Sequence, residues 1–255
     1  MIPLTPLLAE YKNSYFLYAF RHLDRMRSVK SKHLADILAS ESTYLYDIAS
    51  LISYREVQRT EVNRLTQWAK SADAALNLEQ FKLLFEEKIV ELNLRAFQPR
   101  DYSYTFKTIW DVIHFLALII DDMTLNRQKD ISHESMLNNL QAFKTIYYNL
   151  FFKLDCAMCR DHYLNVKGYL IMSVERIEIA FNRERAGEAV VWTDESPSSN
   201  DSLAENRLMR YGILYATMAF HNHINDYRWV QRNVKPPSNH ERMTWTKLRK
   251  ALALT

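Results

Sequence analysis

The only two cysteines of the chain lie three positions apart, in the sequence Cys156-Ala-Met-Cys159. Two thiols at this spacing share one face of a helix and can close into a disulfide with little backbone movement. Asp155 precedes them and is a good N-cap residue, so we expect both sulfurs in the first turn of a helix. Because helix N-termini stabilise negative charge, a thiolate is favoured there. The pair is redox-active, binds metal, or consists of two incidental small apolar residues.

A zinc site would use Cys156, Cys159 and His162, but the usual second pair of ligands is absent from the sequence around them. His221 and His223 are candidates to complete it, yet residues two apart on a helix point to different faces. A c-type haem attachment fails because no histidine directly follows Cys159. Redox chemistry is therefore favoured over metal binding, and we predict no metal ligands.

Two further groups of residues could bind a ligand. Trp110 and His114 are four positions apart, so a helix presents an aromatic plane and an imidazole on one face. The second group is the run from His221 to Asn225, in which His221 and Asn225 share a face with Asn222 beside them. Asparagine is unfavourable inside helices, so this concentration of His and Asn suggests a ligand site, although core packing explains either group as well.

The elements that must position these groups are helices. Apolar residues recur at three-to-four spacing over 33–54, 62–76, 78–97 and 160–181, the pattern of amphipathic helices facing one core. We expect loops at 98–104 and 192–201, a further helix capped by Asp201 or Ser202 and running to about residue 231, and a break at Pro236-Pro237. The sequence thus predicts an all-α fold, with an amino-terminal helical domain over 1–97 and a second domain over 98–255 that carries all three groups.

Composition excludes several classes of protein. The 255 residues include 33 Lys and Arg against 30 Asp and Glu, and a net charge of +3 is too small to indicate nucleic-acid binding. The start of the chain has no secretory signal pattern, and the longest apolar run, Phe115 to Ile120, is too short for a transmembrane helix. Three scattered glycines rule out the phosphate-binding loops of Rossmann and P-loop proteins.

Taken together, the three groups resemble the Erv/ALR-type flavin-linked sulfhydryl oxidases, which carry W-x-x-x-H, C-x-x-C and H-N-x-x-N in this order on helices. The resemblance covers about residues 100–232, and the length, the two cysteines and the phrase LDCAMCRDHYLNV are most similar to the baculovirus members. The matching residues are Trp110 and His114, Cys156 and Cys159, and His221, Asn222 and Asn225.

The resemblance implies a helical bundle that holds FAD, and a thiol oxidase that forms disulfide bonds in substrate proteins. Cys156 would be the outer sulfur that a substrate thiol attacks, and Cys159 the sulfur facing the flavin. Electrons would pass from the substrate dithiol to FAD and then to oxygen, which leaves as hydrogen peroxide. The implied cofactor ligands are Trp110, His114, Cys159, His221, Asn222 and Asn225.

The chain also departs from the family pattern. It has no shuttle cysteines, so a substrate must reach Cys156 and Cys159 directly. The basic residues that usually follow H-N-x-x-N are displaced, because Asp226 takes the near position. Arg228 is the first candidate for the FAD pyrophosphate, with Arg232 and Lys235 as alternatives. His162 is common at its place in the family and is expected to be structural.

The resemblance further implies protein thiols, in particular those of virion proteins, as substrates and a homodimer as the assembled state. It places the protein in the cytoplasm or nucleus of an infected cell, or with virions. Residues 1–97 would be a degenerate bundle or a surface for a partner subunit or a substrate. The competing interpretation from another class is a helical interaction protein, or a zinc module, without redox catalysis.

Overall fold

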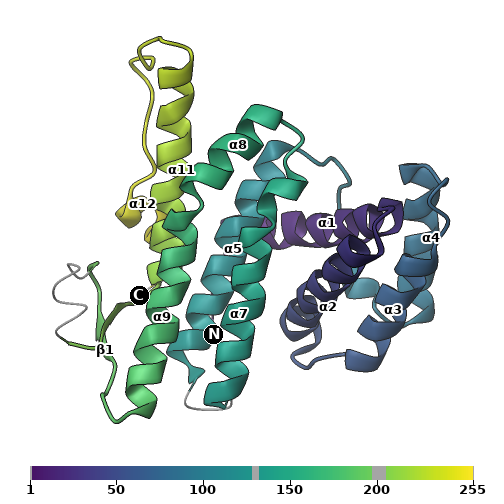
Figure 1. The fold of residues 1–255 in the computed structure, drawn as a ribbon, viewed down its shortest axis with the longest axis horizontal. Helices are drawn as coiled ribbons and strands as arrows, with labels where there is room; N and C mark the ends of the chain where they lie inside the picture. The colour runs from purple at the N-terminus through teal and green to yellow at the C-terminus, as the bar shows by residue number, and fades with distance from the viewer. Residues whose placement is uncertain (1, 128–131, 197–204, 255) are drawn as a thin grey trace. The chain divides into compact units, whose positions relative to one another are not determined.

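The computed structural model describes residues 2–127, 132–196 and 205–254. The chain forms two compact units, Ala9–Val112 and Met1–Leu8 with Ile113–Thr255 (Figure 1). Their boundary falls inside one long helix. The sequence predicts one domain over 1–97 and a second, site-bearing domain over 98–255. These domain limits stay a prediction.

The amino-terminal unit is built from helices joined by short capped turns. Ser31 caps α2 by accepting a hydrogen bond from the amide of Leu34, and Asn77 with Gln80 forms a capping box at the start of α4. Stacked and edge-on aromatic rings around Phe20 fill the core. The elements are α1 (Pro6–Ser28), α2 (Lys32–Tyr54), α3 (Arg59–Ser71), α4 (Leu78–Glu91) and the 3-10 helix η1 (Arg95–Phe97).

The second unit contains the helices that carry all the predicted site residues except Trp110. In Figure 1, α9 lies beside α7 and α11, and α8 runs between the end of α7 and the start of α9. Its elements are α5 (Phe106–Leu125, from Ile113 onward), α7 (His133–Tyr148), the 3-10 helix η2 (Leu150–Lys153), α8 (Ala157–Val166), α9 (Gly168–Arg185), β1 (Val191–Thr193), β2 (Arg207–Met209), α11 (Gly212–Gln231) and α12 (Trp245–Ala251).

A chain of buried hydrogen bonds ties α8 to the rest of this unit. The hydroxyl of Tyr163 on α8 donates to the carbonyl of Tyr147 on α7 at 2.6 Å. The hydroxyl of Tyr147 in turn donates to the carbonyl of Ile113 on α5 at 3.2 Å. Buried side-chain to backbone bonds of this kind fix the helices against one another, so the start of α8 has a defined place in the bundle.

The all-α fold class is confirmed, and the breaks at 98–104 and at Pro236-Pro237 are present. The predicted continuous helix over 160–181 divides at Lys167, where α8 ends and α9 begins with Gly168. None of the helices in the described ranges has the length and hydropathy that a membrane span requires.

The expectation of one helix from residue 201 or 202 to 231 was wrong. Asp201 and Ser202 lie outside the described residues, while Arg207–Met209 forms a strand that pairs in parallel with Val191–Thr193. The helix starts only at Gly212, because Tyr211 before it has a left-handed backbone with φ of 57°. Asn206 supports this arrangement, since its buried amide donates to the carbonyls of Ala180 and Glu188.

Candidate functional site

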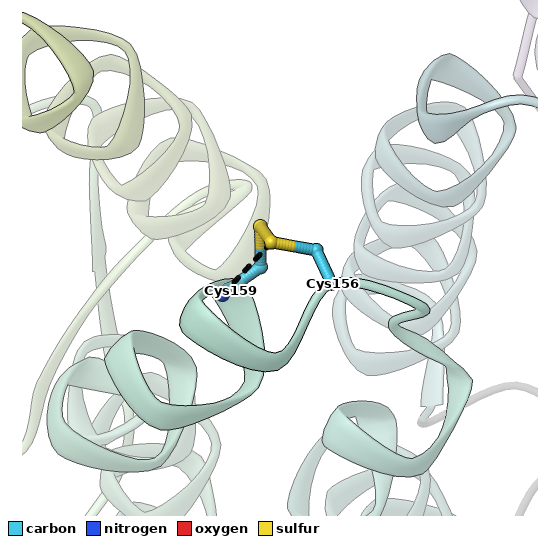
Figure 2. Close-up of a disulfide and its surroundings, with 2 residues drawn as sticks. All are labelled: Cys156 and Cys159. Carbon is cyan, nitrogen blue, oxygen red and sulfur yellow. Dashed lines mark hydrogen bonds between the residues drawn. A yellow bond between two sulfur atoms is a disulfide. The ribbon is translucent and has the colours of Figure 1, made fainter.

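The two cysteines form a disulfide at the start of α8. Cys156, rather than Asp155 as expected, is the N-cap residue, because its sulfur accepts a hydrogen bond from the amide of Cys159 at 3.2 Å (Figure 2). The Cys156 side chain is exposed and that of Cys159 is half-buried. The helix N-terminus thus stabilises negative charge on sulfur, and one sulfur of the pair is open to solvent.

His114 on α5 and His221 on α11 are in direct contact. The Nε2 atom of His114 lies 3.1 Å from Nδ1 of His221, and the ring centroids are 5.4 Å apart. Burial, reinforced by the neighbouring His221, lowers the pKa of His114 to about 3. Burial also lowers the pKa of His221 to about 4. Both rings are therefore neutral near pH 7, and one donates a hydrogen bond to the other.

Trp110 lies one turn before His114 on the same helix, as the spacing predicted. Its side chain is 8% exposed, and its ring meets Phe106 edge-on with centroids 6.1 Å apart. The large aromatic plane is thus mostly shielded from solvent.

A stack of four rings joins α8, α9 and α11, and the sequence analysis did not predict it. The rings of His162 and Tyr227 are parallel with centroids 3.7 Å apart. His223 stacks 5.6 Å from His162 and 5.5 Å from Tyr169. Burial and the nearby His223 lower the pKa of His162. His221 and His223 accordingly face different partners, as their spacing on a helix requires.

Asn222 and Asp226 hold the segment that follows α11 against the helix. The amide of Asn222 donates to the carbonyl of Met243 at 2.8 Å and accepts from its N–H at 2.9 Å. Asp226 pairs with His240 at 3.0 Å and with Arg242 at 2.7 Å. The acid that replaces the expected basic residue therefore recruits two basic side chains from the segment 238–244, which we call the return segment.

The remaining predicted residues also lie on α11. Asn225 is half-buried, one turn after His221. Arg228 is exposed, and its guanidinium carbon lies 4.3 Å from the ring centroid of Trp229. Within the described ranges, no three His, Cys, Asp or Glu side chains gather into a group that could hold a metal ion.

Comparison with known proteins shows the family to which the chain belongs. A model of the family Baculovirus P33 matches residues 5–254. The chain belongs to this family. Over the full length of both chains it is 48% identical to a protein named FAD-linked sulfhydryl oxidase from Autographa californica nuclear polyhedrosis virus. It is likewise 47% identical to the 33 kDa early protein of Orgyia pseudotsugata multicapsid polyhedrosis virus, again over both full lengths.

This P33 family member also has a cavity of about 360 Å³ between α9, β2 and the first half of α11. Its walls include Tyr169, Arg176 and Tyr215, and none of the predicted site residues lines it. Tyr169 belongs both to this wall and to the ring stack through His223. The cavity therefore adjoins the stack without being formed by the three motifs.

The partners that these motifs acquire from elsewhere in the P33 chain could not be predicted from the sequence. Tyr227 and Asp226 lie within the predicted stretch of α11 and were visible in the sequence, but their partners were not. Asp121 had a clear signal, because it ends an otherwise apolar run from Phe115 to Ile120. An acid that is 3% exposed at such a position needs partners inside the protein.

Proposed function

We propose that this protein is an FAD-dependent thiol oxidase that forms disulfide bonds in substrate proteins. Electrons pass from a substrate dithiol through the Cys156–Cys159 pair to FAD and then to oxygen, giving hydrogen peroxide. The observation that carries the proposal is the exposed disulfide at a helix N-terminus, formed by the only two cysteines of the chain. The full-length similarity to a named FAD-linked sulfhydryl oxidase supports it.

The residues present fit a flavin. The Nε2 atoms of His162 and His223 are shielded from solvent and have no hydrogen-bond partner among the described residues. Buried polar atoms of this kind are suited to the donors and acceptors of a bound heterocycle. Trp110, His114, His221 and Asn225 would hold the cofactor together with Asn222, and Arg228 would contact its pyrophosphate.

The observed hydrogen bonds of Asn222, His114 and His221 limit how these residues could contact the cofactor. Asn222 already binds Met243 through both its oxygen and its nitrogen, so it would contribute through the remaining N–H and lone pair, or by holding the return segment. His114 and His221 use one ring nitrogen each on the other, so a cofactor would meet two rings that already hold one another in place.

The thiol chemistry follows from the exposure of the two sulfurs. A substrate thiolate attacks Sγ of Cys156, the exposed sulfur, and the Cys156–Cys159 bond breaks with its electron pair on Cys159. A second substrate thiolate attacks the substrate sulfur of this mixed disulfide, and Cys156 leaves as a thiolate. The substrate has lost two electrons and gained a disulfide, and the enzyme holds a dithiol. FAD, when bound, accepts these two electrons and passes them to oxygen.

The chain's own groups assist this exchange at the start of α8. The amide of Cys159 donates to Sγ of Cys156, so it stabilises the charge that appears when Cys156 leaves the mixed disulfide. The dipole of α8 acts in the same direction on both sulfurs. The half-buried position of Cys159 directs incoming thiols to Cys156.

The test uses purified full-length protein with its flavin. Oxygen consumption and peroxide are measured while a small dithiol is oxidised, for the parent protein and for Cys156→Ser and Cys159→Ser. We expect one peroxide per disulfide in the parent, and loss of turnover with flavin retained in both variants. Ala157→Ser is the matched control, since it adds a hydroxyl between the cysteines and should keep full activity. A colourless parent protein, or turnover that survives both substitutions, would sink the proposal.

The proposal extends to partners and location. Exposed apolar side chains follow one face of α9, with Tyr169 57%, Met172 62% and Ile179 59% exposed, and this stripe supports a homodimer. Virion proteins are the proposed substrates, with the cytoplasm or nucleus of the infected cell as the place of reaction, because the relatives come from baculoviruses. The mass of the parent and of Met172→Glu in solution tests the dimer, which the substitution should weaken.

A further inference from the structure

Asp121 near the end of α5 caps the start of α11. Its side chain is 3% exposed, and its two oxygens accept hydrogen bonds from the amides of Ile213 at 3.2 Å and Leu214 at 2.8 Å. These amides lie in the first turn of α11, where the helix itself offers no acceptor. Tyr211, the residue at the N-cap position, makes no side-chain capping bond. The cap of α11 therefore comes from another helix.

Two contacts join α5 and α11: the capping of α11 by Asp121, and the hydrogen bond between His114 and His221. We call these two contacts the α5–α11 ties. Asp121 lies seven positions after His114, and Leu214 lies seven positions before His221. With a rise of about 1.5 Å per residue, each stretch is roughly 10 Å long. The two helices run in opposite directions, and equal stretches separate the two ties on each. A shift of α11 by one turn, about 5.4 Å, would break both ties at once.

Burying the carboxyl group of Asp121 costs free energy unless the group is hydrogen-bonded. Burial raises the pKa of Asp121 to about 8, while the two amide hydrogen bonds act in the opposite direction. Replacing the side chain would leave two buried amides without an acceptor. The start of α11 would then no longer be held at a fixed position along α5.

We propose that Asp121 is a positioning residue of the redox site, which sets the register of α11 against α5 and thereby places His221 against His114. The inference rests on the proposed role of His114 and His221 in holding FAD. Asp121 itself is not a cofactor ligand, since both of its oxygens face the backbone of α11.

The experiment compares Asp121→Ala with Asn206→Ala in the full-length holoprotein. Both substitutions remove a buried side chain with two hydrogen bonds to the backbone of the same unit, but Asn206 binds Ala180 and Glu188, away from the α5–α11 ties. Flavin affinity is measured by equilibrium dialysis, and the melting temperature by circular dichroism. We expect similar losses of melting temperature, with flavin affinity at least tenfold weaker in Asp121→Ala than in Asn206→Ala. Equal flavin affinities would overturn the proposal.

A double variant asks whether Asp121 acts through His221. If it does, adding Asp121→Ala to His221→Ala should weaken flavin binding little further, because the contact that Asp121 positions is already gone. Independent effects, whose fold-changes multiply, would contradict a positioning role. A His221→Ala protein with the parent's flavin affinity would instead show that the proposed cofactor role of His221 is wrong. The positioning role of Asp121 would then be wrong as well.

Asp121→Asn is the second variant, for use if Asp121→Ala does not fold. Its amide oxygen can still accept from one amide, while its NH2 group faces the other N–H. We expect flavin affinity between that of the parent and that of Asp121→Ala, with a smaller loss of melting temperature. An Asp121→Asn protein that melts earlier but binds flavin like the parent would overturn the proposal.

Discussion

Nε2 of His114 and Nδ1 of His221 lie 3.1 Å apart, which joins α5 to α11 by a hydrogen bond between two imidazole rings. The two residues are 107 positions apart in the chain. A hydrogen bond between two neutral rings requires one donor and one acceptor, so the tautomers of the two residues are coupled. Protonation of the ring whose facing nitrogen is the acceptor places donors on both facing nitrogens and breaks the contact.

The histidine pair predicts sensitivity to acid. Both pKa values lie below the usual value near 6.5, at about 3 and about 4, so the unfolded chain binds protons that the folded protein does not. Their contribution to stability is therefore present above pH 6.5 and is lost as the pH falls from 6.5 towards 3. We expect the unfolding free energy to fall by up to ~1.4 kcal/mol per pH unit for each histidine.

The measurement is denaturant unfolding at a series of pH values for the parent and for His114→Gln, which keeps a hydrogen-bonding side chain but cannot titrate. The variant should lose less stability in acid. His33→Gln, at an exposed histidine on α2, is the control and should follow the parent. A His114→Gln curve with the parent's slope would refute the coupling of this pair to folding.

The roles of the two sulfurs predict different spectra. If Cys159 faces the flavin, Cys156→Ser leaves a free thiolate beside the oxidised ring, and a long-wavelength charge-transfer band should appear. Cys159→Ser leaves only the outer Cys156 and should lack the band. Visible absorption spectra of both variants at equal flavin content check this, and equal spectra would reverse or abolish the assignment.

The return segment gives a third prediction. Asp226→Ala removes the partner of both His240 and Arg242, so the segment 238–244 keeps its attachment through Asn222 but loses the charged one. Amide exchange in this segment should become several-fold faster, with little change in the core. Glu241→Ala is the matched control, because Glu241 pairs with Lys247 in α12 and not with α11. Unchanged exchange in Asp226→Ala would mean that the contacts of Asp226 with His240 and Arg242 do not hold the segment.

Reduction of the disulfide should leave the fold intact. The bond closes a loop of only four residues, for which the chain-entropy relation gives a contribution of about 2 kcal/mol. Tyr163 and Leu154, buried on either side of the pair, hold α8 independently of it. Circular dichroism melts with and without reductant should therefore differ by a few degrees, and two thiols should titrate. A collapse of helical signal on reduction would identify the disulfide as a structural staple.

The sequence by itself determined the helical class, most of the helices and the three motifs. Trp110 and His114 share a face of α5 because the 3.6-residue period of a helix is a local property of the backbone. The same holds for the position of Cys156 and Cys159 at a helix start. The sequence pattern did not predict β2, because the local preference of its residues for a strand is weak. This short strand forms only because Val191–Thr193 lies beside it.

Only the tertiary structure decided which side chains from distant parts of the chain contact one another. His114 faces His221, His162 stacks on Tyr227, and Asp121 caps α11, yet each pair is far apart in the chain. No periodicity encodes these contacts, because they depend on which helices pack together and at what register. Sequence spacing specifies the face on which a side chain lies, whereas packing of the buried apolar surface selects the partner of that face.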